Sequence, residues 1–249
     1  MNHSLFQSLN DIKPAFKNQD YDPETIMMGS ISFLRRAVER RDEAVKQFLL
    51  DLAKKPATTL EERFARARAI SWLGHYKDPH LLPLFVRLLS VTRGICQHET
   101  ILSLVELDDP RAAGAIAELL EQETKPREIE FLLGALCSVR APEYLDLIAT
   151  YLPSQNLVIR IAAITSLLAL GATTGRKEVL EIAIPFLEDP DQTVRIKTAY
   201  HINMQFPNEF YDRGLEHHLP EGLRFPRRPQ QDQQPPEAAQ SATPAMALA

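Results

Sequence analysis

The residues of this sequence best suited to metal chemistry are the pair His98-Glu99 and the adjacent histidines His217-His218. Imidazole and carboxylate groups are common ligands of transition metals, but a two-metal centre needs more ligands than one pair supplies. Adjacent side chains on a helix or strand also point in different directions, so they do not converge on one ion. The sequence therefore predicts no metal site and no cofactor.

The two cysteines, Cys96 and Cys137, both lie in apolar stretches with helical spacing. Cysteine in such a stretch usually packs as a small hydrophobic side chain, and two cysteines provide neither a zinc-ligand set nor a disulfide framework. No Ser/His/Asp arrangement, glycine-rich phosphate loop or pair of catalytic carboxylates is recognisable. The residue types thus favour a non-catalytic protein.

Basic residues gather between positions 35 and 68, where phosphates would be natural ligands. Acidic residues are interleaved with them throughout, a mixture that suits ion pairs within helices better than a nucleic-acid surface. We therefore do not expect nucleic-acid binding. The basic residues are Arg35, Arg36, Arg40, Arg41, Lys46, Lys54, Lys55, Arg63, Arg66 and Arg68, and the acidic ones are Glu39, Asp42, Glu43, Asp51, Glu61 and Glu62.

Composition indicates a soluble globular chain: 45% of its 249 residues are hydrophobic, 24% are charged, and the net charge is −5. The N-terminus lacks the basic and apolar regions of a secretory signal. The longest apolar run, 161–172, is too short to cross a bilayer. We therefore expect no membrane association and a cytoplasmic location.

The elements that hold these residues follow from an internal repeat. Pro79, Pro110 and Pro142 lie 31 and 32 residues apart, and each precedes an apolar helical pattern. A leucine that closes this pattern recurs after 31, 32 and 35 residues, at Leu89, Leu120, Leu152 and Leu187. Each unit therefore holds two helices, of which the second follows the proline, or Gly175 in the fourth unit.

First helices are expected at 63–75, 95–107, 127–139 and 157–171, and an earlier pair at 22–41 and 42–55. A fifth unit is predicted to begin at Asp189, as N-cap, with Pro190 at the first helical position and Gln192 completing a capping box. Ile159-Arg160 matches Val194-Arg195 at a distance of 35 residues. The first helix of this unit should therefore reach residue 206.

Helix pairs that recur every 30 to 40 residues form solenoids, in which each unit covers the apolar face of the next. From about residue 60 to 206 the units resemble HEAT repeats, in particular the short HEAT-like repeats of phycobilisome-lyase relatives. The resemblance rests on the Asp-Pro-x-x-x-Val-Arg start at Asp189, on Asp78-Pro79 and Asp109-Pro110, and on the Leu-Leu helix ends. The third unit departs from the pattern, with Ala141 before its proline. The resemblance implies an all-α, right-handed α-solenoid of about five to six HEAT-like helical hairpins.

The second helices leave one polar stripe, because their other columns, which include Val86 and Ile182, are apolar. By resemblance to HEAT proteins, the second helices should line the concave side. The stripe then predicts an acidic groove for a protein partner with a basic or polar surface; the alternative is a solvated face that keeps the solenoid soluble. The predicted partner-binding residues are Arg87, Arg111, Glu118, Glu121, Glu143, Asp146, Glu178 and Glu181.

Four segments are expected: an N-terminal capping segment (1–21), the HEAT-like solenoid (22–206), a C-terminal cap (207–225) and a disordered tail rich in proline, glutamine and alanine (226–249). The favoured function is a non-catalytic scaffold or adaptor for a protein partner. The resemblance leaves two alternatives open, a bilin-lyase-like or chromophore-handling protein and a nucleic-acid-binding HEAT-like protein.

Overall fold

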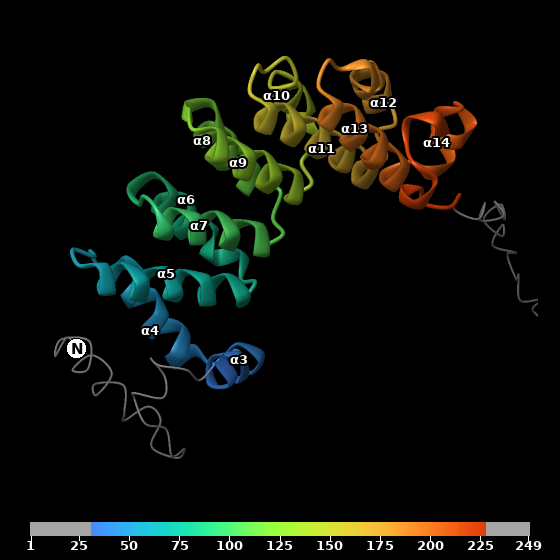
Figure 1. The fold of residues 1–249 in the computed structure, drawn as a ribbon. Coiled ribbons are helices and arrows are strands. Elements are labelled where there is room, and N and C mark those ends of the chain that lie inside the picture. Colours follow the sequence, from blue (N-terminus) through green and yellow to red (C-terminus); the bar gives the residue numbers. More distant parts are fainter. Residues whose placement is uncertain (1–30, 228–249) are drawn as a thin grey trace, which may run out of the picture.

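The computed structural model describes residues 31–227, and within this range every regular element is a helix. The all-α prediction is therefore confirmed for the described part of the chain. The expected N-terminal segment 1–21, and the expected tail apart from residues 226 and 227, lie outside it. The helices follow one another in chain order along a curved row (Figure 1).

The helices come in consecutive pairs, which we call first and second helices. The pairs are α3 (Ile31–Glu39) with α4 (Glu43–Lys54), α5 (Leu60–His75) with α6 (Leu82–Val91), α7 (Ile95–Glu106) with α8 (Ala112–Gln122), α9 (Pro126–Ser138) with α10 (Leu145–Ala149), α11 (Leu157–Thr174) with α12 (Val179–Ala183), and α13 (Gln192–Gln205) with α14 (Pro207–Asp212). Short 3₁₀ turns precede α6 (η2, Pro79–Leu81) and α10 (η3, Pro142–Tyr144), extend α12 (η4, Ile184–Glu188) and follow α14 (η5, Leu215–His218; η6, Glu221–Leu223).

A residue with positive φ marks the junction inside each of the first five pairs. The angles are 52° at Arg41, 47° at Lys77, 52° at Asp108, 56° at Arg140 and 72° at Gly175. The leucines that define the predicted repeat follow the last four of these junctions by 12 residues each, and all four are buried. The recurrence seen in the sequence thus corresponds to equivalent places in successive pairs.

Stacking of the first helices supplies much of the core: α5 packs on α7, α9 on α11, and α11 on α13. At the first contact the backbones come very close, because a Cβ added to Gly74 would lie 2.9 Å from the Cα of Ser103. An apolar column runs through the stacked helices at the repeat spacing, and its members are between 0% and 3% exposed. These are Ile70, Ile101, Leu133 and Leu168.

Hydrogen bonds also join residues one repeat apart. The Ser103 hydroxyl donates to the carbonyl of Ile70 (2.9 Å), and the Tyr151 hydroxyl donates to that of Leu120 (3.1 Å). Nearer the N-terminus, the Lys46 ammonium donates to Asp78 (2.7 Å), and both side chains are mostly buried. These bonds satisfy polar groups that the contact between units would otherwise leave unpaired.

The start of α13 differs from its prediction. The N-cap is Asp191, whose carboxylate accepts the amide N–H of Thr193 (2.7 Å), and the helix begins at Gln192. The carboxylate of Asp189 instead binds the Arg160 guanidinium of α11 (2.9 and 3.2 Å) and the amide N–H of Asp191. Asp189 is only 7% exposed. Arg160 of the preceding unit therefore binds the Asp189 carboxylate, which the local sequence predicts to be the N-cap.

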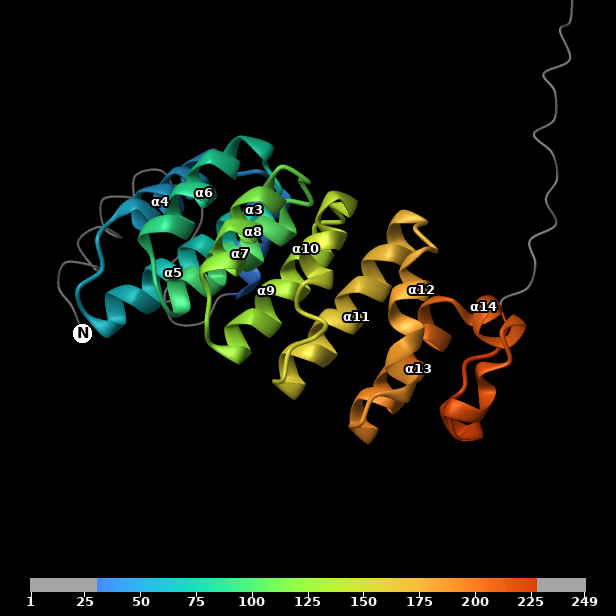
Figure 2. The same cartoon turned by 90° about the horizontal axis from the view of Figure 1, so that it is seen from above.

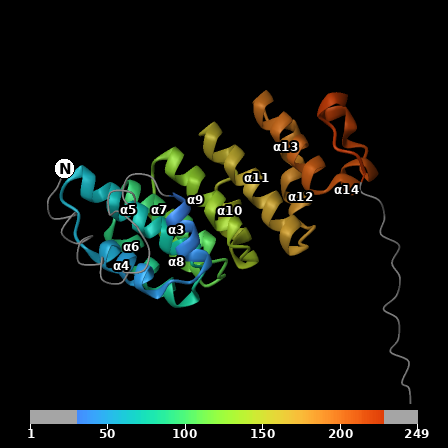
Figure 3. The same ribbon diagram turned by 90° about the horizontal axis from the view of Figure 1, so that it is seen from below.

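The expectation that the second helices line the concave side is also corrected. In Figure 1, α8, α10 and α12 lie along the outer side of the curve and α7, α9, α11 and α13 along its inner side. The views from above and below show the first and the second helices as two adjacent rows (Figure 2, Figure 3). The close contact of Gly74 with Ser103 draws α5 and α7 together, while a groove separates α6 from α8, so these units bend toward the first helices.

One described helix, α11, is long and apolar enough to cross a membrane by length and composition alone. Half of it is buried inside the protein, between α9 and α13. A core helix packed between neighbouring helices passes the same test of length and composition.

Candidate functional site

All eight side chains predicted to bind a partner are exposed, as a surface stripe requires. They lie on or just before the second helices α6, α8, α10 and α12. Val86 and Ile182, which belong to the apolar columns, are also 38% and 40% exposed. The solvent-accessible surface of the second helices is therefore wider and more apolar than a single polar stripe.

Two of the eight residues meet in a groove of about 410 Å³ between α6 and α8, which we call the α6–α8 groove. Arg87 contributes from α6 and Glu118 from α8, and apolar side chains lie between them. The other six predicted residues line neither this groove nor the pocket described next. The full lining is Pro83, Val86, Arg87, Leu89, Ser90, Ala115, Glu118, Leu119 and Gln122.

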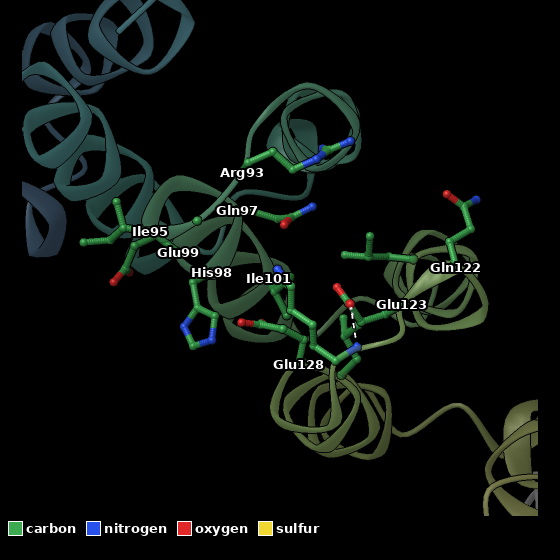
Figure 4. A pocket seen from close by; sticks show the side chains of 13 residues that line it. Arg93, Ile95, Gln97, His98, Glu99, Ile101, Gln122, Glu123 and Glu128 are labelled. Atoms are coloured by element: carbon green, nitrogen blue, oxygen red, sulfur yellow. Dashed lines mark hydrogen bonds between the residues drawn. The ribbon is translucent and has the colours of Figure 1, made fainter. Parts of the chain in front are cut away.

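A second hollow, of about 580 Å³, adjoins this groove and shares Leu119 and Gln122 with it. It lies where α7 and α9 are less closely packed than the other successive first helices from α5 onward. Figure 4 shows its side chains gathered from α7, from the end of α8, from α9 and from the connections that precede α7 and α9. We call it the α7–α9 pocket; sequence patterns do not reveal it, because it arises from a gap between units.

The pair His98-Glu99, from which the sequence predicts no metal site, lines the α7–α9 pocket, and its imidazole is engaged in a ring contact. The His98 ring stacks on Phe131 of α9, with centroids 3.7 Å apart and planes 14° apart. Nearby, Glu123 accepts the amide N–H groups of Thr124 (2.8 Å) and Lys125 (2.9 Å), and the Lys125 hydrogen bond lowers its carboxyl pKa. Across residues 31–227, no three His, Cys, Asp or Glu side chains converge as metal ligands.

Both cysteines have protonated thiols at neutral pH. Burial raises the pKa of the Cys96 thiol, whose Sγ donates to the carbonyl of Arg63 (3.3 Å). Burial also raises the pKa of Cys137 to about 11. A thiol of this kind is a poor nucleophile, so both residues act in packing, as their apolar surroundings in the sequence predict.

Ion pairs divide the predicted stripe. Glu178 is paired with Arg176 (2.9 Å) and Glu181 with Arg213 (2.6 Å). A hydrogen bond from its own backbone N–H, and then one from Arg176, lowers the carboxyl pKa of Glu178, and the Arg213 hydrogen bond lowers that of Glu181. Arg111 is likewise paired, with Asp109. The remaining acidic members have no ion-pair partner among residues 31–227, and we call them the unpaired acidic residues. They are Glu118, Glu121, Glu143 and Asp146.

Several members of the basic cluster serve the fold. Lys46 reaches Asp78 in the next unit, and Arg66 Nε donates to the carbonyl of Ala53 (2.8 Å). Among the interleaved acidic residues, Asp42 is the N-cap of α4 and Glu62 completes a capping box with Thr59. These contacts agree with the structural use of the charges that their mixture indicates.

Comparisons with known proteins give no further guide. No protein-family model matches this chain, and no curated protein matches it.

Proposed function

We propose that this protein is a non-catalytic scaffold or adaptor, built as a right-handed HEAT-like α-solenoid, that binds a protein partner on its second helices. The period of the helix pairs, their stacking in chain order and the helical fold support the solenoid. Helical repeat proteins commonly bind partners across several units, because neighbouring helices present a regular extended surface.

The observation that carries the proposal is the α6–α8 groove beside the unpaired acidic residues. Val86, Ala115 and Leu119 give the groove an apolar lining, and Arg87 and Glu118 stand among them. Glu121 lies one helical turn from Glu118 on α8 and is also unpaired. A partner that inserts an apolar side chain between α6 and α8 and places a basic side chain beside α8 would satisfy both features.

Recovery of protein partners by affinity purification from the source cells, followed by cross-linking, tests this proposal. Reversing two charges, Glu118→Lys with Glu121→Lys, should reduce recovery of a specific partner at least tenfold. The additional change Val86→Glu should abolish it, because the groove then presents a charge to an apolar side chain.

The matched control reverses two exposed acidic residues elsewhere, Glu39→Lys with Glu61→Lys, which alters net charge by the same amount. Equal recovery of the partner by the wild-type chain and both reversed variants would contradict the proposal. So would loss of the partner with the control pair alone.

A further inference from the structure

The apolar column of the first helices ends in a polar residue. Continuing the spacing one repeat beyond Leu168 leads to Asn203 on α13, which is 0% exposed. In the earlier units this position is covered when the next first helix packs on it. After α13 no further first helix follows in the described chain, and a buried amide stands where the other units have isoleucine or leucine.

The main chain of a single residue, Phe225, satisfies this amide. Asn203 Oδ1 accepts the Phe225 N–H (2.5 Å), and Asn203 Nδ2 donates to the Phe225 carbonyl (3.3 Å). The Tyr211 hydroxyl donates to the same carbonyl (3.0 Å). Both backbone polar groups of one residue are thus bound by side chains, as when an extended peptide is recognised through its backbone.

Side-chain contacts of Phe225 and Arg227 flank this backbone contact. The Phe225 ring meets the Tyr200 ring edge to face, with centroids 5.3 Å apart. Two residues later, Arg227 pairs with Asp212 (2.7 Å) and lies 5.3 Å from the centre of the Tyr211 ring. This surface, which we call the clamp, is formed by Tyr200, Asn203, Tyr211 and Asp212. It therefore binds an aromatic residue that is followed two positions later by arginine.

The segment in the clamp, residues 219–227, is held loosely elsewhere, and we call it the strap. Leu219 anchors it at 2% exposed, but residues 220–223 and 225–227 are exposed, and the Phe225 side chain itself is 36% exposed. The strap turns once, at η6, is extended again at Arg224, and carries Pro226, which favours an extended backbone at Phe225. It therefore loses little buried surface on leaving the clamp.

Release without replacement is nevertheless unfavourable, because it leaves the buried Asn203 amide without the partners it has in the described chain. A second extended peptide would restore those hydrogen bonds. We propose that the clamp is a binding site for an extended peptide of a partner protein, with an aromatic residue, a following proline and an arginine two positions after the aromatic residue. The strap occupies this site in cis and competes with the partner. The site is separate from the α6–α8 groove and does not depend on it.

A full-length chain with a weakened strap, Phe225→Ala with Arg227→Ala, tests the proposal. A fluorescent peptide of the sequence LPEGLRFPRRP, which copies residues 219–229, is titrated with this variant and with the wild type, and binding is followed by anisotropy. The peptide should bind the variant at least tenfold more tightly than the wild type, because the competing strap no longer fills the clamp.

Two controls identify the contact. The same peptide N-methylated at its phenylalanine keeps the ring but loses the N–H that Asn203 accepts, so it should bind at least tenfold more weakly. Adding Asn203→Leu to the weakened-strap chain restores the residue type of the other units and should abolish binding; its circular dichroism and melting temperature report whether it folds.

Three results would overturn the proposal. The first is absence of saturable binding to the weakened-strap chain, and the second is equal affinity for the plain and N-methylated peptides. The third is a dimer that the wild-type chain forms and that Asn203→Leu disrupts, because the clamp would then take the strap of a second copy. The peptide titration reports on the clamp alone, whatever the outcome of the charge-reversal experiment on the second helices.

Discussion

At the scale of single residues, contacts between units override local preferences. Asp189 has the sequence context of an N-cap, yet it is buried against Arg160 of the preceding unit, and Asp191 takes the capping role. The two arginines of the predicted match do occupy equivalent places. Arg160 donates to the carbonyl of Ser154 and Arg195 to that of Asp189, in each case six residues earlier.

Because Asp189 forms a buried ion pair and Asp191 caps the helix, we expect mutation of Asp189 to lower the free energy of unfolding more than mutation of Asp191. Asp189→Ala leaves the mostly buried Arg160 guanidinium without its carboxylate and should lower the free energy of unfolding by about 3 kcal/mol. Asp191→Ala removes only the N-cap, a partly exposed side chain, and should cost less. Urea unfolding followed by circular dichroism measures both; a larger loss for Asp191→Ala would show that the Asp189–Arg160 pair stabilises the fold less than the cap does.

A second prediction at this scale concerns pH. Burial, with a smaller contribution from Lys197, lowers the pKa of His201 below its ordinary value of 6.5, and its Nδ1 is buried without a hydrogen-bond partner in the described chain. The unfolded chain therefore binds a proton more readily than the folded one. The contribution of neutral His201 to the free energy of unfolding is complete above the pKa that the residue has in the unfolded chain. It is lost as the pH falls through the lower pKa that the residue has in the folded chain.

The variant His201→Phe removes both the titration and the unpaired nitrogen. It should raise the free energy of unfolding by about 1 kcal/mol at neutral pH, and by more at pH 5, so its stability should fall less steeply than that of the wild type. Thermal melts at several pH values between 5 and 8 measure this difference. Parallel pH profiles for the two proteins would show that His201 does not titrate differently on folding.

At the scale of helices, the sequence predicts the pairs well and their connections poorly. Apolar spacing locates the helices because each pair buries recurring leucines. The left-handed junctions escape prediction because three of the last four are Lys77, Asp108 and Arg140, residue types that give no glycine signal. The α7–α9 pocket and the clamp escape it too, since both depend on how separate elements meet.

Two helical glycines test the stacking of the first helices. Gly74→Ala places a methyl group 2.9 Å from the Cα of Ser103 and should cost about 2 kcal/mol by forcing α5 and α7 apart. Gly134→Ala, on an exposed face of α9 with no atom of another element within 4 Å, should stabilise the protein by about 1 kcal/mol through helix propensity alone. Chemical denaturation should show these opposite signs, and destabilisation by both would indicate that Gly134 is also a packing position.

At the scale of the whole molecule, each helix packs mainly against its own unit and the next, so stability should be distributed along the row. The side toward which the row curves is not evident from repeat spacing, because it depends on relative separations of first and second helices. The exposure of the predicted stripe does follow from sequence, since polar residues recur on one face of the second helices. The sequence does not show which charges of the stripe lack an ion-pair partner, because Arg213 pairs with Glu181 from 32 positions away.

Hydrogen–deuterium exchange of Gly74→Ala compared with the wild type tests the row of stacked pairs most directly. If units depend chiefly on their neighbours, protection should fall in α4 to α7 and stay close to wild type in α11 and α13. An equal loss of protection across all helices would mean that the chain unfolds as one cooperative core, and would contradict the arrangement on which both proposed binding surfaces depend.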